Sequence, residues 1–444
     1  MKRKMASALV VSCAMLGLTA CGSATPTTGA VAPAASFTPV AQDSGSAITV
    51  WVDSTRLPMV QAYQKAHPGV KLNVVTYSGD ANGANDFQTK VDLYNRSGSG
   101  WPDVVFSTTL ADASWTTSGS EPFAAPVSEG VVPTSTLDGF AQGALAPCTV
   151  DGKVYCVRND LAQGVLWYNK TLMKQWGYQV PTTWEQYEQL GKEVAKQHPG
   201  YLVGDADLTA NIYLWASQCP ADTVTGDMQT SVDLSSPDCT RMANLEDTLI
   251  KAGSFADESV FDASFIKDEA SKVLMMPGPS WFGQDLFDDS LKIPAGQIAA
   301  AAPLKWASDS QTYTGDYGGG LWFISAHSKN LAADAALVEW LTTSDTVQAS
   351  APTYPAYAPA AKAWLANPAN TSYFADDVAP VFEQAANEVW PGWTDTTEYN
   401  IGSLFTSTVL PNVVQGQTIT SQLPALQTAI VDKATSLGYK VTEH

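Results

Sequence analysis

The sequence predicts an α/β protein in which helices cover a parallel sheet and at least two packed units share the chain. Three observations lead to this class. The chain has 444 residues, whereas a typical domain has roughly 100 to 200. Apolar residues make up 45% of it and charged residues 15%, which is typical of a globular body. Between residues 47 and 75, a strand pattern, a helix pattern and a second strand pattern follow one another, and this indicates a βαβ unit.

The first twenty residues predict a secretory signal peptide. Three basic residues at positions 2–4 precede a mostly apolar run at residues 6–20, which is too short to span a bilayer. The run ends in Leu-Thr-Ala followed by Cys21, and this resembles the lipobox of bacterial lipoproteins. The resemblance implies cleavage before Cys21 and attachment of a lipid to its sulfur. The alternative is an ordinary signal peptide with a chance cysteine.

Residues 21–46 predict a disordered tether. From residue 22 onward the segment is built mainly from Ala, Thr, Ser, Gly and Pro and carries one charge, Asp43, so it lacks the apolar surface that folding requires. As a flexible coil of about 25 residues, it is expected to hold the body roughly 25 to 30 Å from the membrane.

The charge balance argues against a nucleic-acid partner. The chain has 24 basic and 44 acidic residues, a net charge of -20, and no Lys/Arg-rich stretch interrupts this field in the main body. A polyphosphate would therefore be repelled. No apolar run reaches the roughly 18 residues of a membrane-spanning helix.

The cysteines predict two disulfide bonds. Cys13 lies in the signal peptide and Cys21 is the lipid-carrying residue, which leaves four thiols and three possible pairings. Cys148 and Cys156 flank two short strands around an Asp-Gly turn, so we expect a bridge between them. The second bridge then joins Cys219 to Cys239. A zinc site is the alternative, but no Cys-x-x-Cys spacing occurs and the histidines are far apart in the sequence. We therefore expect no metal and no cofactor.

The elements follow in order. Residues 47–52 predict a strand, residues 55–66 a helix that ends at His-Pro-Gly, and residues 70–75 and 103–106 two more strands. Ligands gather at the carboxyl ends of parallel strands, which here are Asp53 and Ser107 with the residues after them.

Two later helices are predicted from their periodicity. The Thr-Trp-Glu-Gln motif at residues 183–186 fits a capping box, and the apolar face of that helix consists of Trp184, Tyr187, Leu190 and Val194. A helix over residues 331–341 is expected to bury Ala335, Val338 and Leu341 and to turn Asp334 and Glu339 to water.

Several segments, in their order along the chain, resemble the extracellular solute-binding proteins of sugar ABC importers, the maltose-binding-protein-like class. The segments are 48–51 (ITVW), 65–69 (KAHPG), 102–105 (PDVV), 151–155 (DGKVY), 168–170 (YNK), 181–185 (PTTWE), 275–281 (MMPGPSW) and 318–325 (GGGLWFIS).

The resemblance implies a two-lobed periplasmic-binding-protein-like fold with a hinge and a ligand cleft between the lobes. By analogy one lobe comprises residues 47–156 and 317–362, and the other residues 157–316 and 363–444. It also implies a non-catalytic monomer, lipid-anchored at the extracellular face of a Gram-positive cell membrane, that passes a neutral oligosaccharide to ABC permease subunits.

A neutral oligosaccharide requires aromatic rings against its C-H faces and planar polar groups at its edges. Trp281 is the first candidate, because the matching loop of the family supplies a Trp that packs on a sugar ring. Trp390 and Trp393 lie in a stretch with no helical periodicity, Tyr317 lies where the family's chain recrosses the hinge, and Trp115 is a further aromatic candidate. The polar candidates are Asp53, Ser107, Asn159, Asp160, Gln163 and Asp316, and for Asp53 the alternative is a helix N-cap.

Two other classes stay open at this point. A secreted glycoside hydrolase requires two carboxylates about 5 to 10 Å apart, and 44 acidic residues allow such a pair. No Gly-x-Ser-x-Gly, His-Glu-x-x-His or phosphate-cradling loop is present. A peptide or amino-acid receptor on the same fold requires a fixed Arg and acid pair.

Overall fold

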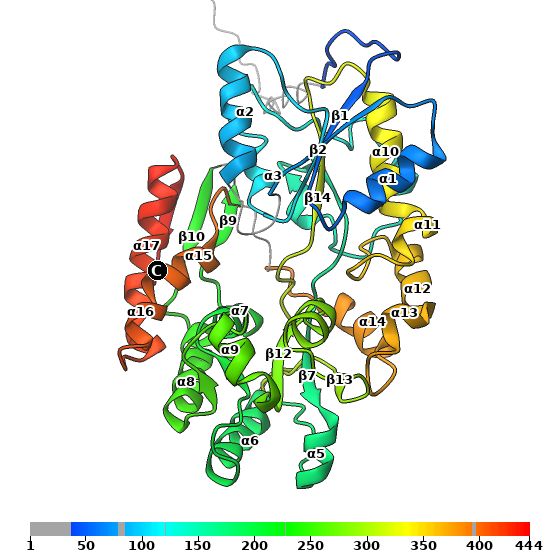
Figure 1. Ribbon diagram of the computed structural model, residues 1–444. Helices are drawn as coiled ribbons and strands as arrows, with labels where there is room; N and C mark the ends of the chain where they lie inside the picture. The colour runs from blue at the N-terminus through cyan, green and yellow to red at the C-terminus, as the bar shows by residue number, and fades with distance from the viewer. Residues whose placement is uncertain (1–36, 79–84, 120, 227, 393–396) are drawn as a thin grey trace, which may run out of the picture. The chain divides into compact units, whose positions relative to one another are not determined.

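The computed structural model describes residues 37–78, 85–119, 121–226, 228–392 and 397–444 (Figure 1). The predicted signal peptide at residues 1–20, the lipid-carrying Cys21 and the tether up to residue 36 lie outside this part of the chain. Within the described ranges, no helix combines the length and the apolarity that crossing a bilayer demands.

A five-stranded sheet forms the core of the first half of the body. Its strand order is β2-β1-β3-β14-β6. β1 pairs in parallel with β2 and β3, and β14 runs antiparallel to β3 and β6. The predicted βαβ unit is therefore confirmed, and α1 lies beside α10 at one side of this sheet (Figure 1). The bounds are β1 (Ile48–Val52), α1 (Leu57–Ala66), β2 (Leu72–Thr76), β3 (Val104–Ser107), β6 (Cys156–Arg158), β14 (Leu321–Ile324) and α10 (Leu331–Thr343).

The second half is built on an antiparallel sheet with the order β12-β7-β13, so the predicted parallel pairing does not describe this sheet. All three strands are largely buried, and helices pack around them (Figure 1). The bounds are β7 (Gly164–Asn169), α5 (Lys170–Trp176), α6 (Trp184–Gln197), α7 (Leu208–Ala216), α8 (Pro237–Ala252), β12 (Met275–Pro279), the π-helix η3 (Phe282–Ser290) and β13 (Ile298–Ala301).

Shorter elements complete the described chain. In the first half and its connections they are α2 (Asn85–Ser97), α3 (Asp112–Trp115), α4 (Thr134–Leu137), η1 (Ala146–Cys148), β4 (Thr149–Val150), β5 (Lys153–Val154), α11 (Asp345–Gln348) and α12 (Ala358–Ala366). In the second half and the C-terminal region they are β8 (Gly204–Asp205), β9 (Thr223–Gly226), β10 (Gln229–Val232), β11 (Phe255–Ala256), α9 (Ala263–Asp268), η2 (Ala270–Lys272), α13 (Pro368–Thr371), α14 (Ala379–Asn387), α15 (Ile401–Thr408), α16 (Leu410–Val413), α17 (Ile419–Ser436) and β15 (Lys440–Glu443).

The helix predicted from the capping box is confirmed. The Thr183 hydroxyl accepts a hydrogen bond from the Gln186 backbone N–H at 3.2 Å, and the predicted apolar face of α6 is buried. The second helix prediction is wrong about Asp334, whose side chain is fully buried in the first turn of α10. Burial raises the pKa of Asp334 to about 7.

Residues 37–46 lie against the start of α10, and this differs from the predicted tether. Gln42 Oε1 accepts from the N–H of Leu331, the first residue of α10, at 3.0 Å, and Gln42 Nε2 donates to the carbonyl of Ser328, which precedes α10, at 3.0 Å. Asp43 N–H donates to the Lys329 carbonyl at 2.6 Å. Composition missed this because the contacts use backbone and amide groups rather than apolar area.

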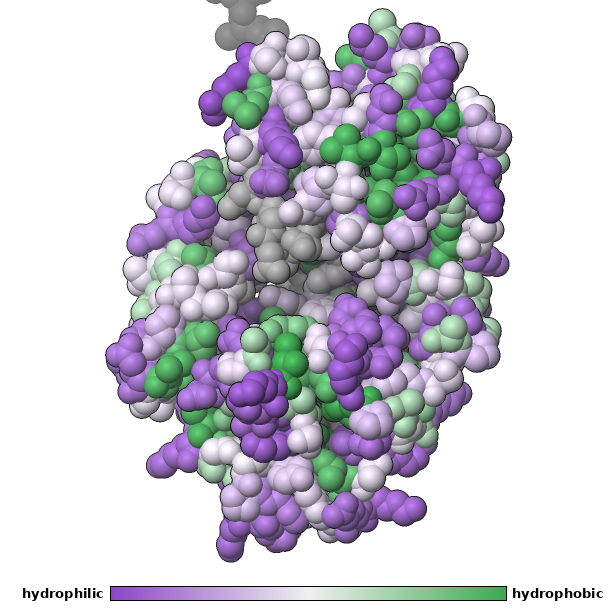
Figure 2. All heavy atoms as spheres, in the orientation of Figure 1, coloured by the Kyte–Doolittle hydropathy of each residue, from purple (hydrophilic) through white to green (hydrophobic). Residues whose placement is uncertain are grey.

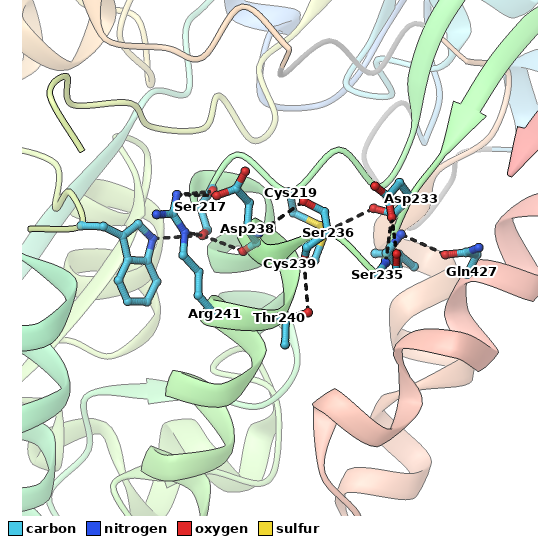
Figure 3. Close-up of a disulfide and its surroundings, with 12 residues drawn as sticks. Ser217, Cys219, Asp233, Ser235, Ser236, Asp238, Cys239, Thr240, Arg241 and Gln427 are labelled. Atoms are coloured by element: carbon cyan, nitrogen blue, oxygen red, sulfur yellow. Dashed lines mark hydrogen bonds and ion pairs between the residues drawn. A yellow bond between two sulfur atoms is a disulfide. The ribbon is translucent and has the colours of Figure 1, made fainter. Parts of the chain in front are cut away.

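Both predicted disulfides are present. Cys148 is bonded to Cys156 and Cys219 to Cys239. The second bridge joins the chain just after α7 to the first turn of α8 (Figure 3).

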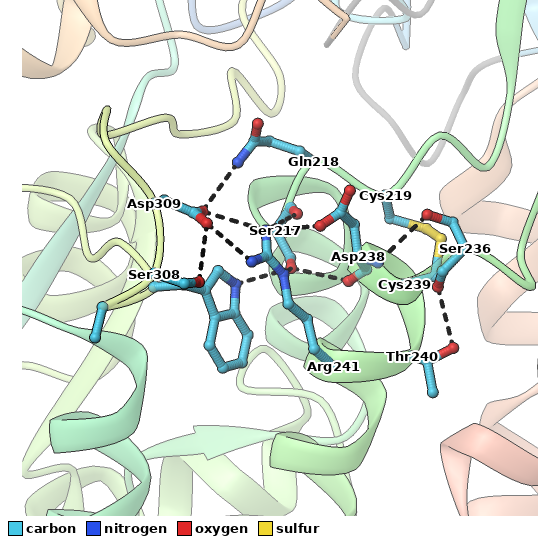
Figure 4. A network of polar contacts seen from close by, with 12 residues as sticks. Ser217, Gln218, Cys219, Ser236, Asp238, Cys239, Thr240, Arg241, Ser308 and Asp309 are labelled. Carbon is cyan, nitrogen blue, oxygen red and sulfur yellow. Dashed lines mark hydrogen bonds and ion pairs between the residues drawn. A yellow bond between two sulfur atoms is a disulfide. The ribbon is translucent and has the colours of Figure 1, made fainter.

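Next to this bridge, Arg241 of α8 ties its helix to two other segments (Figure 4). Its Nη1 lies 3.1 Å from an Asp309 carboxylate oxygen, and its guanidinium stacks 4.9 Å from the Trp306 ring centroid. Its Nη2 donates to the Ser217 carbonyl at 3.2 Å and lies 2.8 Å from an oxygen of Asp238 on the same helix. The network fixes the loop at residues 306–309 and the end of α7 onto α8.

Two buried carboxyl groups stand out in the helical layer of the second half. Glu246 on α8 and Asp205 on β8 are both fully buried, and neither carboxylate oxygen of Glu246 has a hydrogen-bond partner. Burial raises the pKa of Asp205 to about 7 and that of Glu246 well above its usual range. In the unfolded chain both groups titrate near pH 4.

We predict that the free energy of unfolding falls as the pH rises from about 5 to 8, because the unfolded state releases protons that the folded state retains. In Glu246→Gln this decrease should be smaller, because the substituted side chain does not titrate. Urea unfolding at both pH values measures it, with the exposed Glu443→Gln as the control. If the free energy of unfolding changed equally with pH in wild type and Glu246→Gln, Glu246 would not be a source of the pH dependence.

Candidate functional site

Three segments lie side by side between the two sheets: residues 158–164, 314–320 and 353–357. The first runs from β6 to β7 and the second leads into β14, so these two connect the halves. The first two are joined by hydrogen bonds from the Gly164 N–H to the Gly315 carbonyl at 2.8 Å and from the Tyr317 N–H to the Ala162 carbonyl at 3.1 Å. The first and third segments are joined by a hydrogen bond from the Leu161 N–H to the Tyr354 carbonyl at 2.8 Å. These segments form the connection at which a hinge was predicted.

An ion pair is buried within this connection. Arg158 is fully buried, and its Nη2 lies 3.2 Å from an Asp316 carboxylate oxygen and donates to the Gly318 carbonyl at 2.7 Å. The other Asp316 oxygen accepts from the Ala162 N–H at 2.7 Å. Gly319 is required here, because its φ is +87° and a Cβ would lie 2.4 Å from Arg158 Nη2.

The predicted polar candidates Asn159, Asp160 and Gln163 lie in the same connection and are buried. Asp160 Oδ1 accepts from the Asn159 amide and from the Gly320 N–H, each at 2.9 Å. Asn159 Oδ1 accepts from Trp322 Nε1 at 3.1 Å, and Gln163 Nε2 donates to the Phe382 carbonyl at 3.3 Å. Their side chains thus hold the crossing segments, and direct contact with a ligand stays a prediction.

Asp53 and Ser107 follow β1 and β3 as predicted, and both are buried. Asp53 Oδ1 accepts from the Arg56 N–H at 2.7 Å and Oδ2 lies 3.2 Å from Arg56 Nη1, so Asp53 orders the start of α1. Ser107 Oγ donates to Asp112 Oδ2 at 2.6 Å. Trp115 packs edge-on against Phe87, with 5.7 Å between ring centroids.

Trp281 is half-buried at the junction of β12 and η3. Its Nε1 donates to the Tyr317 carbonyl at 2.9 Å. Gly318 allows this approach, since a Cβ there would lie 3.1 Å from the indole nitrogen. Trp281 and Tyr317, predicted from distant parts of the sequence, are therefore brought together at the crossing segments.

The other aromatic candidates lie further along the chain. The Trp390 side chain is half-exposed, and the backbone N–H of this residue donates to the Thr314 carbonyl at 2.8 Å. Trp393 lies outside the described residues.

Sequence reasoning missed two charged residues, Arg56 and Asp285. Arg56 lies on the β1–α1 turn with its guanidinium 5.0 Å from the Phe106 ring centroid, and its buried Nε has no partner. Asp285 lies in η3. Burial raises the pKa of Asp285 to about 6, and the Arg56 charge opposes this rise. Only spatial proximity couples the two residues, so no pattern in the sequence indicated them.

Asp285 is also surrounded by acidic groups. Asp289 on η3 and Asp160 in the first crossing segment both raise its pKa. Of the three charged groups in the described part of the chain that shift this pKa, Arg56 lowers it and so favours the ionised carboxylate. Opposite charges from two elements of the two halves can hold the two ends of a polar ligand.

The described residues contain no group of three or more His, Cys, Asp or Glu side chains suited to a metal ion. A cavity of about 20 Å³ lies behind the crossing segments, lined by Gly164, Trp184 and Thr314 among others. It has room for one water molecule and not for a sugar ring.

The comparisons with known proteins agree with this architecture. Residues 49–348 match the family model described as bacterial extracellular solute-binding protein. A multiple sugar-binding protein of Streptococcus mutans is 25% identical over 215 residues, covering 45% of this chain and 50% of that protein. The chain thus spans about half the length of this curated relative.

Solved structures are similar over most of both chains. The galacto-N-biose-/lacto-N-biose I-binding protein of the ABC transporter from Bifidobacterium longum has a TM-score of 0.72 at 20% identity, covering 90% of this chain and 100% of that one. A transporter-associated binding protein from B. animalis subsp. lactis, in complex with beta-1,6-galactobiose, has a TM-score of 0.70 at 18% identity, with 89% and 99% covered. These likenesses show the two-lobed fold, in which the two sheets are the lobe cores.

We predict that Asp316→Ala lowers the free energy of unfolding by about 3 to 5 kcal/mol, because it leaves the fully buried Arg158 without its counter-charge. Glu188→Ala, which removes the partner of Lys192 in an exposed pair, is the control and should cost below about 1 kcal/mol. Chemical unfolding measures both, and equal small losses would show that the buried pair contributes little.

Proposed function

Because the chain belongs to the bacterial extracellular solute-binding proteins, we propose that it captures a neutral oligosaccharide between its lobes and delivers it unchanged to ABC permease subunits. One observation supports this most: Trp281 is half-exposed and held against the crossing segments by its bond to the Tyr317 carbonyl. An indole fixed at the connection between lobes is suited to stack on the C-H face of a sugar.

The proposal assigns polar contacts to Arg56 and Asp285. A guanidinium offers several donors and a carboxylate accepts two or more hydroxyl hydrogens. A sugar ring presents hydroxyls at both edges, so one ligand can bond both residues when the lobes close. Only contacts absent from the open arrangement shift the closure equilibrium, and contacts to two lobes at once meet this condition.

The names of the similar proteins support a sugar as the ligand. The curated relative is a multiple sugar-binding protein, and the solved structures cited above are complexes with lacto-N-biose and with beta-1,6-galactobiose. An opposed Arg and Asp is also what a receptor for a peptide or amino acid requires. Zwitterionic ligands therefore belong in the same binding screen.

We also propose where the protein is located and which residues form each lobe. A lipid on Cys21 tethers the protein, as a monomer, to the extracellular face of the membrane. We place one lobe at residues 47–156 plus 317–362 and the other at 157–316 plus 363–444.

A calorimetric screen of neutral di- to tetrasaccharides, amino acids and dipeptides tests the proposal. We expect saturable binding of a few related sugars, with a rise in melting temperature, and unaltered sugar on chromatography. Shorter products on chromatography would indicate a hydrolase, and binding of dipeptides alone would indicate a peptide receptor.

We predict that Trp281→Ala weakens sugar binding by at least about 1 kcal/mol, from lost stacking and contact area. Trp281→Phe should retain part of the affinity, because it keeps an aromatic face and loses the bond to the Tyr317 carbonyl. Trp176→Ala, at an indole stacked on His198, is the control. An unchanged dissociation constant for Trp281→Ala would remove this residue from the site.

We also predict that sugar affinity falls as the pH is lowered from 7.5 to 5, because protonation of Asp285, with a pKa of about 6, removes acceptor capacity. If only the ionised form binds, the loss is about tenfold at pH 5. Asp285→Asn should bind weakly at both pH values and show a flatter profile. If the affinity of Asp285→Asn changed with pH as much as that of the wild type, another group would be responsible for the pH dependence.

A further inference from the structure

We propose that Ser118 and Glu398 form a latch between the two lobes, a side-chain contact that favours the closed arrangement without touching the ligand. The pair thereby sets how easily the protein closes on any ligand. This inference goes beyond the proposed function and takes from it only that the lobes open and close.

The first observation is a hydrogen bond between the two halves. Ser118 follows α3 in the first half, and Glu398 precedes α15 in the C-terminal region, where α15 packs on α7 and α17 packs on α8. The side chains of Ser118 and Glu398 are hydrogen-bonded to each other. Burial raises the pKa of Glu398 and this bond lowers it, so the Ser118 hydroxyl donates to the ionised carboxylate.

The second observation is the support on which Glu398 stands. The residues on either side of it, Thr397 and Tyr399, are buried, and both bond the Asp222 carboxylate, Tyr399 through its hydroxyl at 2.7 Å. The Glu398 N–H donates to the Tyr439 hydroxyl at 3.1 Å. The backbone at Glu398 is therefore anchored in the second half, and its side chain reaches Ser118 from a fixed position.

The third observation is that Ser118 has a second acceptor within its own half. Its hydroxyl is placed to donate to the Trp115 carbonyl at 2.8 Å, and a serine hydroxyl carries only one hydrogen. When the lobes separate, this hydrogen returns to the Trp115 carbonyl and water solvates the Glu398 carboxylate. Neither group is then left without a partner, which keeps the contact weak enough to open.

Two other roles give different expectations. If the bond belongs to an interface that never opens, its loss lowers stability and leaves the distance between the lobes unchanged. If Glu398 contacts the ligand directly, its loss affects different sugars to different extents. Measurements of interlobe distance and of sugar affinity separate these roles from a latch.

The first experiment measures the distance between the lobes in the absence of any ligand. Nitroxide-bearing unnatural amino acids replace Lys65 of α1 and Lys251 of α8, both exposed, and pulsed electron paramagnetic resonance gives the distance distribution. We expect Ser118→Ala and Glu398→Ala each to lower the ratio of short to long distances about threefold to tenfold, as for the loss of one hydrogen bond. The double variant should lower it no further. Ser97→Ala, whose hydroxyl also donates to the carbonyl three residues earlier, is the control.

The second experiment measures dissociation constants for those neutral di- to tetrasaccharides that bind the wild type. Because the latch does not touch the ligand, Ser118→Ala and Glu398→Ala should raise the dissociation constant of every bound sugar by the same factor. Glu443→Ala, at an exposed acid in β15, is the control and should leave these constants unchanged.

Unchanged distances in both single variants overturn the latch, and a lower melting temperature with unchanged distances assigns the pair to a permanent interface. Additive effects in the double variant also overturn it, because the two residues then act separately. Factors that differ between sugars assign Glu398 to the ligand site instead. If no sugar binds the wild type, the proposed function fails, whereas the ligand-free distances still decide whether the latch exists.

Discussion

The buried ion pair between Arg158 and Asp316 is the interaction on which the arrangement of the site depends. It joins two crossing segments that are about 160 residues apart in the sequence, and the same guanidinium bonds the Gly318 carbonyl. Because that carbonyl follows Tyr317, whose own carbonyl holds the Trp281 indole, the electrostatic centre of the connection also positions the exposed ring. A fully buried charge tolerates little displacement from its partner, which makes this connection well defined.

This arrangement separates scaffold from contact surface. The polar residues of the crossing segments bond mainly to one another, although Nη1 of Arg158 has no hydrogen-bond partner. Arg56 also keeps a buried Nε without a partner, and Asp285 and Trp281 are half-exposed. The scaffold residues fix the distances between the crossing segments, and the contact residues remain able to bond a ligand. The proposed binding function is favoured by this separation, because the contact residues can bond a ligand reversibly while the scaffold residues keep their own bonds.

Local patterns in the sequence predicted the βαβ unit, the capped helix α6 and both disulfides, since each depends on residues close together in the chain. The site residues remain predictions. Asp53 was proposed for its place after a strand and Asn159 from the family resemblance, and the structure shows them bonded to Arg56 and Trp322. Arg56 and Asp285 were missed, because their significance comes from neighbours brought close by folding. Asp334 was misjudged because its burial depends on the packing around the start of α10, which the periodicity of the helix does not show.

The segment before β1 has a mechanical consequence. Residues 37–46 are bonded to residues 328–331 at the start of α10. A pull on the chain at Phe37 would therefore be shared among several backbone and amide hydrogen bonds before it reached β1, which shields the first strand from strain.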